Sequence, residues 1–263
     1  MSVELNHRIS GQGEPLILLH GLFGSLENLG GIARRLEDHW QIHALDQRNH
    51  GGSSHSDEMN YPAMASDVVA YMDAKGIQKA RLLGHSMGGK VAMQVALSYP
   101  ERVQAIIVAD IAPVTYPARH DAILEGMKSL DLRGVKSRTE ADARLAEYVE
   151  IPGVRQFLLK NLERIPKEES AEEDLLFRWR LNLPVIDGSY AHLAAAPEGD
   201  GPHEGKVLFI KGADSAYIQN KHQDTIRRLF PNAELKIIEG TGHWLHAEKA
   251  DTFATMCRQF LEQ

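Results

Sequence analysis

The chain has 263 residues, enough for one large α/β domain or two small ones. Its 25% charged residues are ordinary for a globular protein in water, and its net charge of −7 argues against a nucleic-acid-binding surface. The sequence shows no signal peptide and no apolar run of the roughly 20 residues that a membrane span needs. Its single cysteine, Cys257, excludes an intrachain disulfide, and a cytoplasmic location is expected.

Short apolar segments alternate with amphipathic ones along the chain. We expect an edge strand over residues 3–9 and buried strands over 16–19, 42–45, 81–83, 105–109, 207–210 and 235–238. Helices are expected over 28–38, 62–75, 88–98, 220–229 and 246–261. This alternation predicts an α/β fold with a mainly parallel sheet covered by helices on both faces. Ligands of such sheets bind beyond the carboxyl ends of the strands.

The alternation stops in the middle of the chain. Residues 114–202 contain no clear strand pattern, and helices are expected near 119–129, 139–150 and 153–163. We therefore predict a core domain made of residues 1–113 and 203–263, with residues 114–202 inserted as a helical cap. A cap supplies an apolar pocket and excludes water from the chemistry. The alternative is a purely structural layer of helices.

The motif Gly84-His85-Ser86-Met87-Gly88 fits G-x-S-x-G. It falls between a predicted strand and a predicted helix, where a sharp turn exposes the serine hydroxyl and small neighbours let the turn close. The pattern alone is common, but its placement at this joint predicts that Ser86 is a nucleophile.

A serine nucleophile needs an adjacent base that a third group orients. His243 is the best candidate, because its glycine-flanked loop follows the last strand and precedes the last helix. His243 and His246 are three residues apart, but no carboxylate or cysteine set at metal-ligand spacing accompanies them, so no metal is expected.

Two carboxylates compete for the orienting role, and both satisfy the chain order Ser…Asp…His. Asp214 follows the strand over 207–210, but it lies one residue short of the usual position, which Ser215 occupies. Asp110 stands directly at the end of its strand. We favour Asp110 and keep Asp214 as the alternative.

The turn His20-Gly21-Leu22-Phe23-Gly24 follows the strand over 16–19. It can aim the backbone N–H of Leu22 at an oxyanion, together with the N–H of Met87 after the nucleophile. The loop from Asp46 to Ser53 is interpreted as a scaffold for this turn. An acyl pocket lined by aromatic side chains is also expected, with packing of the cap helices on one another as the alternative reading. Its candidates are Phe23, Phe157, Phe177, Trp179, Tyr190 and Trp244.

These segments together resemble the α/β-hydrolase superfamily over the whole chain, and more closely its small bacterial esterases of the YbfF type. The resemblance rests on the turn from His20, on Asp46 to Ser53, on Gly84 to Lys90, and on Gly242-His243-Trp244. It implies a cofactor-free esterase that acts on short acyl esters and acyl-CoA thioesters. It also implies that Ser215 replaces the usual acid and that Asp110 serves instead.

The predicted function is therefore hydrolysis of a small-molecule ester, and of thioesters, through an acyl-enzyme on Ser86. A carbon–carbon bond hydrolase of the same fold is one alternative, and a small-molecule-binding protein with an inert triad is another. The sequence fixes neither the acyl length nor the oligomeric state.

Overall fold

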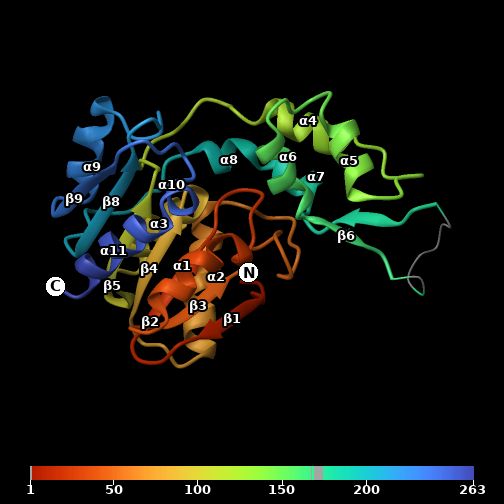
Figure 1. Cartoon of the computed structure of the whole chain (residues 1–263). Coiled ribbons are helices and arrows are strands. Elements are labelled where there is room, and N and C mark those ends of the chain that lie inside the picture. The colour runs from red at the N-terminus through yellow and green to blue at the C-terminus, as the bar shows by residue number, and fades with distance from the viewer. Residues whose placement is uncertain (1, 167, 169–173) are drawn as a thin grey trace.

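The structure is a computed structural model that describes residues 2–166, 168 and 174–263. Within these residues a seven-stranded sheet has the order β1-β3-β2-β4-β5-β8-β9 (Figure 1). β1 pairs antiparallel with β3, and all other neighbours are parallel. The strands are β1 (His7–Ser10), β2 (Pro15–Leu19), β3 (Gln41–Leu45), β4 (Ala80–His85), β5 (Val103–Ala109), β8 (Lys206–Gly212) and β9 (Ala233–Ile238). The mainly parallel sheet predicted from the sequence is confirmed.

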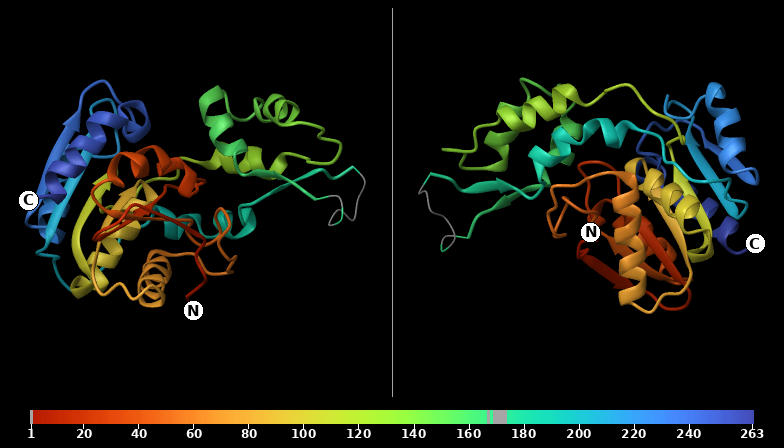
Figure 2. Two further views of the ribbon diagram at one scale, coloured as in Figure 1. Left: turned by 60° about the horizontal axis from the view of Figure 1, so that its bottom comes forward. Right: turned by 180° about the vertical axis from the view of Figure 1, so that it is seen from behind.

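The central strands are apolar on both sides because helices cover both faces of the sheet. In β5, Ile106 and Val108 belong to one buried cluster, while Ile107 and Ala109 belong to the other. The first cluster includes α2 (Tyr61–Ala74), α3 (Met87–Ser98) and α9 (Gln223–Leu229). The second includes α1 (Gly30–Leu36) and α11 (Ala250–Leu261) on the opposite face (Figure 2). Single turns of 3₁₀ helix, η1 (Leu26–Leu29), η2 (Pro100–Arg102) and η3 (Asn220–His222), precede α1, β5 and α9.

The chain leaves the sheet after β5 and returns to it at β8. The intervening segment carries five helices in its described part, and it extends to one side of the sheet (Figures 1 and 2). They are α4 (Asp121–Ser129), α5 (Arg138–Leu145), α6 (Pro152–Leu159), α7 (Leu183–Gly188) and α8 (Tyr190–Ala194).

The expectation that this insertion contains no strand is wrong. β6 (Leu162–Arg164) and β7 (Phe177–Trp179) pair antiparallel and place Trp179 opposite Leu162. Each strand has three residues with a charged one in the middle, which is too short for a period of two to stand out. The helix expected over 153–163 consequently ends at Leu159, where α6 gives way to this hairpin.

Two further boundaries differ from the sequence expectation. The edge strand starts at His7 rather than at residue 3, because Val3 and Asn6 donate their backbone N–H groups to the side chains of Asp67 and Ser53. The last helix is split into α10 (Leu245–Glu248) and α11, since Lys249 between them leaves the helical conformation, with a φ of −134° and a ψ of 61°.

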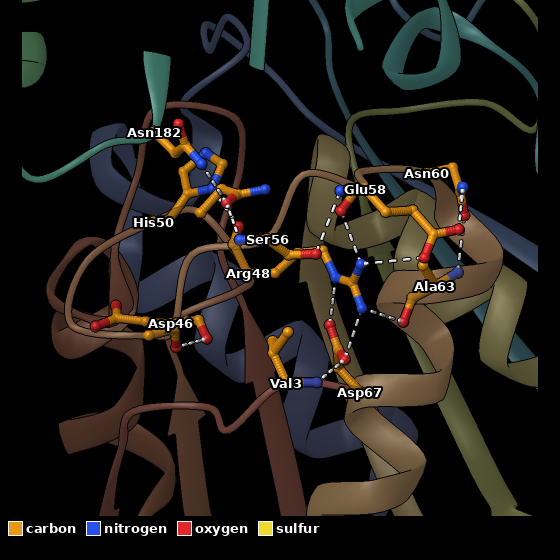
Figure 3. Close-up of polar contacts among 12 residues, drawn as sticks. Val3, Asp46, Arg48, His50, Ser56, Glu58, Asn60, Ala63, Asp67 and Asn182 are labelled. Carbon is orange, nitrogen blue, oxygen red and sulfur yellow. Dashed lines mark hydrogen bonds and ion pairs between the residues drawn. The ribbon is translucent and has the colours of Figure 1, made fainter. Parts of the chain in front are cut away.

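The loop that follows β3 is held by a buried ion pair (Figure 3). The Arg48 side chain is fully buried, and its Nε and Nη2 donate to the two carboxylate oxygens of Asp67 at 2.6 and 2.9 Å. Nη1 of Arg48 also donates to the carbonyl of Glu58 at 2.7 Å. Asp46 at the start of the loop accepts from the N–H groups of Leu26 and Gly52. These contacts hold the loop in place beside the turn that follows β2.

Removing one charge of this pair should destabilise the fold strongly. In Asp67→Asn, the guanidinium of Arg48 stays buried without its counter-charge, and we expect a loss of about 3–5 kcal/mol in the free energy of unfolding. Asp73→Asn on the same helix is the control, because Asp73 pairs with Arg102 at an exposed position and such pairs contribute about 1 kcal/mol or less. Urea unfolding of both variants checks this, and equal losses would contradict it.

Candidate active site

Ser86 lies at the joint between β4 and α3, as its motif predicts. Its φ of 53° is in the left-handed region, which a non-glycine residue seldom adopts. The turn closes only because its glycines lack side chains: a Cβ on Gly84 would lie 2.1 Å from the carbonyl oxygen of Gly88, and one on Gly88 would lie 2.1 Å from that of Leu19. The motif therefore holds the serine in strained backbone geometry at the carboxyl end of the sheet.

His243 lies in the loop between β9 and α10 and reaches Ser86 across the sheet edge. Its Nε2 is 3.0 Å from the Ser86 hydroxyl oxygen, and its Nδ1 is 2.8 Å from Oδ2 of Asp110. When Nδ1–H donates to the carboxylate, Nε2 is free to accept the serine proton. The imidazole stacks on the ring of Tyr217, with centroids 4.0 Å apart. This is the arrangement that general-base activation of a serine requires.

Asp110 directly follows β5, with a φ of 52°, and its side chain is fully buried. Its Oδ1 accepts from the backbone N–H of Gly212 at 3.1 Å, and its Oδ2 accepts from both His243 and the Ser215 hydroxyl. Asp214, the alternative acid, is exposed, and its backbone N–H donates to Thr241. The structure therefore brings Asp110 against His243 and leaves Asp214 outside. The hydroxyl of Ser215 is a partner of Asp110 that spacing alone did not identify.

The turn after β2 brings Leu22 to the same place. The N–H of Gly24 donates to the carbonyl of Gly21 at 3.0 Å, and Phe23 has a φ of 60°. These features define a type II turn with Leu22 and Phe23 at its centre. Leu22, Ser86 and Met87 line one cavity. Met87 is the first residue of α3, where backbone N–H groups have no partner within the helix.

The cavity beside Ser86 is small, with a volume of about 50 Å³. Part of its lining comes from residues 114–202, including Tyr116, Tyr190 and Leu193. The other lining residues are Tyr61, Lys90, Ile111, Pro117, Arg119, His120, Ala194 and Tyr217. Lys90 and Arg119 are basic, and the described lining contains no carboxylate.

The aromatic residues expected to line the pocket differ from those observed. Tyr190 does line it, but Phe23, Phe157, Trp179 and Trp244 do not. Phe157 packs against Trp244 with ring centroids 5.8 Å apart, Phe23 meets His120 edge-on, and Trp179 belongs to the hairpin. Phe177 is buried in the same hairpin. These rings stabilise contacts among the insertion, the turn and the loop of His243, so the packing alternative describes them better.

Two buried histidines support the site from behind. Nε2–H of His85 donates to the backbone carbonyl of His243 at 2.8 Å. Nε2 of His20 accepts from the backbone N–H of Gln47 at 3.0 Å. Burial lowers the pKa of both imidazoles, which keeps them neutral.

Among the residues that the structure describes, no group of three His, Cys, Asp or Glu side chains is placed to hold a metal ion, and no helix has the length and apolar character to cross a membrane.

Lys90 is a buried lysine that lines the cavity. Its Nζ donates to the carbonyls of Ala194 and Ala195 at 2.9 and 2.5 Å and lies 4.9 Å from the ring centroid of Tyr116. Carbonyl oxygens and an aromatic face satisfy its hydrogens without a full counter-charge. Burial lowers the pKa of Lys90 from 10.5 to about 7.

This depressed pKa predicts a pH dependence of stability. Between about pH 7 and pH 10 the unfolded chain keeps a proton on Lys90 that the folded chain has released, so stability rises with pH in this window. We expect the unfolding free energy of the wild type minus that of Lys90→Met to increase with pH there, by at most about 1.4 kcal/mol per pH unit. Urea titrations of both proteins at several pH values measure it, and a constant difference would contradict the prediction.

Comparison with known proteins identifies the family of the chain. A family profile described as "alpha/beta hydrolase fold" matches residues 14–250. Esterase YbfF of Escherichia coli (strain K12) is 39% identical over 251 residues, which are 94% of this chain and 92% of that protein. The sn-1-specific diacylglycerol lipase ABHD11 of Xenopus tropicalis is 40% identical over 261 residues, 96% of this chain and 79% of its own. A solved structure described as a marine microorganism esterase has a TM-score of 0.93 and 39% identity, covering 98% of this chain and all of its own.

Proposed function

The chain belongs to the α/β-hydrolase family and hydrolyses carboxylic esters, and on this premise we propose that Ser86, His243 and Asp110 are its catalytic residues. The observation that carries the proposal is the continuous hydrogen-bond chain from the Ser86 hydroxyl through His243 to Asp110. The alternative of an inert binding protein does not account for this alignment. Relatives at about 40% identity carry esterase or lipase names, which favours ester substrates over carbon–carbon bond cleavage.

The reaction proceeds in two steps. His243 takes the proton of Ser86 as the hydroxyl oxygen attacks the acyl carbonyl, and Asp110 stabilises the imidazolium that forms. The N–H groups of Leu22 and Met87 hold the oxyanion. His243 then protonates the leaving alcohol or thiol, and water hydrolyses the acyl-enzyme by the reverse sequence. No cofactor takes part in these steps.

Residues 114–202 act as a cap in this proposal, because Tyr190 and Leu193 of the insertion line the same cavity as Ser86. They limit the entry of bulk water while admitting the one water that hydrolyses the acyl-enzyme, and they bind the apolar part of the substrate. We further propose that the protein works in the cytoplasm, since its single cysteine, Cys257, is a buried free thiol that forms no disulfide.

Acyl-CoA thioesters are proposed as substrates besides simple esters. The guanidinium of Arg119 is an exposed part of the cavity lining and lies 5.3 Å from the ring centroid of Tyr217, where it can meet a phosphate of a large leaving group. The same acyl-enzyme forms from an ester or a thioester, so only the leaving group differs.

A substrate panel tests the range of leaving groups. p-Nitrophenyl esters of graded length, a diacylglycerol and several acyl-CoAs are compared for kcat/KM in the wild type and in Arg119→Ala. We expect all active substrates to require Ser86, and Arg119→Ala to lower kcat/KM for acyl-CoA by about 10-fold, the effect of losing roughly one charged contact, while p-nitrophenyl acetate is unaffected. Release of free CoA at the background rate would refute the thioester part and leave the esterase assignment standing.

A further inference from the structure

The turn that carries Leu22 is strained at one residue. Phe23 occupies the third position of the type II turn, which requires a positive φ and is therefore usually glycine. A residue with a Cβ disfavours this conformation, so it persists only where surrounding contacts impose it. Phe23 is buried, and both its backbone N–H and its carbonyl have side-chain partners.

The partner on the N–H side is a histidine of the core. The backbone N–H of Phe23 donates to Nε2 of His50 at 3.2 Å. Nδ1–H of His50 in turn donates to the carbonyl of Arg48 at 2.9 Å, which leaves Nε2 as an acceptor. The His50 ring is fully buried, and this burial lowers its pKa to about 3, so it stays neutral and accepting.

The partner on the carbonyl side comes from the insertion. Nδ2 of Asn161 donates to the carbonyl of Phe23 at 2.7 Å and also to that of Leu158 at 3.1 Å. The Asn161 residue is 4% exposed, and its backbone carbonyl accepts from the backbone N–H of Arg180 at 2.9 Å. It follows the end of α6 and starts the hairpin, so it is fixed in the insertion and reaches into the core.

The two contacts clamp Phe23 from opposite sides. The Leu22–Phe23 peptide takes its orientation from His50, and the Phe23–Gly24 peptide takes its orientation from Asn161. A relaxed turn would rotate these two peptides and shift the adjacent Gly21–Leu22 peptide, whose N–H the proposed function assigns to the oxyanion hole, because the left-handed φ of Phe23 sets the shape of the whole turn.

We propose that Asn161 is a positioning residue for the oxyanion hole, and that the insertion thereby completes the catalytic geometry of the core. This inference rests on the oxyanion role assigned to Leu22 in the proposed function. The insertion then has a second task besides lining the pocket: the hole is fully formed only while Asn161 is bound to Phe23.

Asn182 provides a matched control. It also belongs to the insertion and also donates to a core loop, from its Nδ2 to Oδ1 of Asn49 at 3.1 Å (Figure 3). Its described hydrogen bonds to the core all go to Asn49 and none goes to the turn of Leu22. A residue that only anchors the insertion should behave as Asn182 does. Asn161→Ala and Asn182→Ala therefore separate anchoring from positioning.

The experiment measures kcat and KM for a p-nitrophenyl ester, and the inhibition constant of a trifluoromethyl ketone, which forms a tetrahedral oxyanion on the serine. Removing an oxyanion donor costs about 10²–10³-fold in kcat, so misplacing one should cost roughly 10–100-fold. We expect this loss in Asn161→Ala, with an equal weakening of the ketone and a KM within about threefold, because the ground state uses the hole little. Asn182→Ala should stay within about twofold of the wild type. Asn161→Asp, which has the same shape but no donor, should match Asn161→Ala and replaces it if the alanine variant does not fold.

A second variant tests the strain directly. Phe23→Gly adopts the positive φ without a penalty, so in that background Asn161→Ala should lower kcat by less than about threefold.

Leu22→Pro tests the oxyanion role of Leu22, on which this inference rests. Proline suits the second position of a type II turn but has no N–H, whereas Leu22→Ala keeps the N–H. Wild-type kcat in Leu22→Pro overturns both the oxyanion role of Leu22 and this inference. A large loss in Leu22→Pro, with Asn161→Ala no worse than Asn182→Ala, overturns this inference alone.

Discussion

Ser86→Ala should abolish ester hydrolysis, with kcat lowered by about 10⁶-fold, because the nucleophile, the base and its orienting acid act as one unit. The Ser86 hydroxyl oxygen is the atom that becomes acylated in the proposed mechanism, and alanine removes it. Alanine has the same Cβ and the same left-handed φ to adopt, so the turn and the glycines around it should keep their geometry.

Two measurements check this expectation. Hydrolysis of p-nitrophenyl acetate is followed in both proteins, and a fluorophosphonate probe should label the wild type but not Ser86→Ala. The melting temperature is the control for folding. Full hydrolysis by Ser86→Ala would show that a different residue carries the chemistry, whatever the hydrogen bonds of His243.

Much of the fold can be read from the sequence because burial on both faces leaves a clear signal. The strands β2, β3, β4, β5 and β8 are short apolar runs between amphipathic helices, and parallel pairing brings their carboxyl ends to one edge. This is why Ser86 and His243, 157 residues apart, meet at hydrogen-bond distance. The β6–β7 hairpin was not predicted, because strands of three residues are too short to show an alternation of apolar and polar side chains.

The walls of the site were harder to predict than its polar centre. Tyr217 stacks on His243 and Tyr116 donates to the carbonyl of Tyr217. Both tyrosines lie in irregular segments whose course depends on the packing of the insertion, and no periodicity marks such positions. The clamp on Phe23 was equally hidden, because Asn161 is 138 residues away from it. Local motifs identify groups that chemistry demands, whereas the partners that place them come from tertiary contacts.

Geometry at the end of β5 explains why Asp110 can take the place of the usual acid. The carboxylate is buried and held on one side by the N–H of Gly212 and on the other by the Ser215 hydroxyl, so one oxygen is aimed at His243. Ser215 occupies the usual acid position and donates a hydrogen bond instead of a charge. Asp214 beside it is exposed and points its charge to solvent, where screening weakens any effect on the imidazole.

Asp110→Asn should therefore lower kcat by roughly 10⁴-fold, while Asp214→Asn should stay within about twofold of the wild type. Asparagine tolerates the left-handed φ of Asp110 better than alanine does, so the fold is preserved and the loss reports on charge and tautomer. An amide next to Nδ1 of His243 favours the tautomer with the proton on Nε2, which cannot accept the proton of Ser86. Steady-state kinetics of both variants, with melting temperatures as the folding control, decide the assignment. A large loss of kcat in Asp214→Asn, with wild-type kcat in Asp110→Asn, would assign the orienting acid to Asp214 instead. The hydrogen bond between Asp110 and His243 would then be structural only.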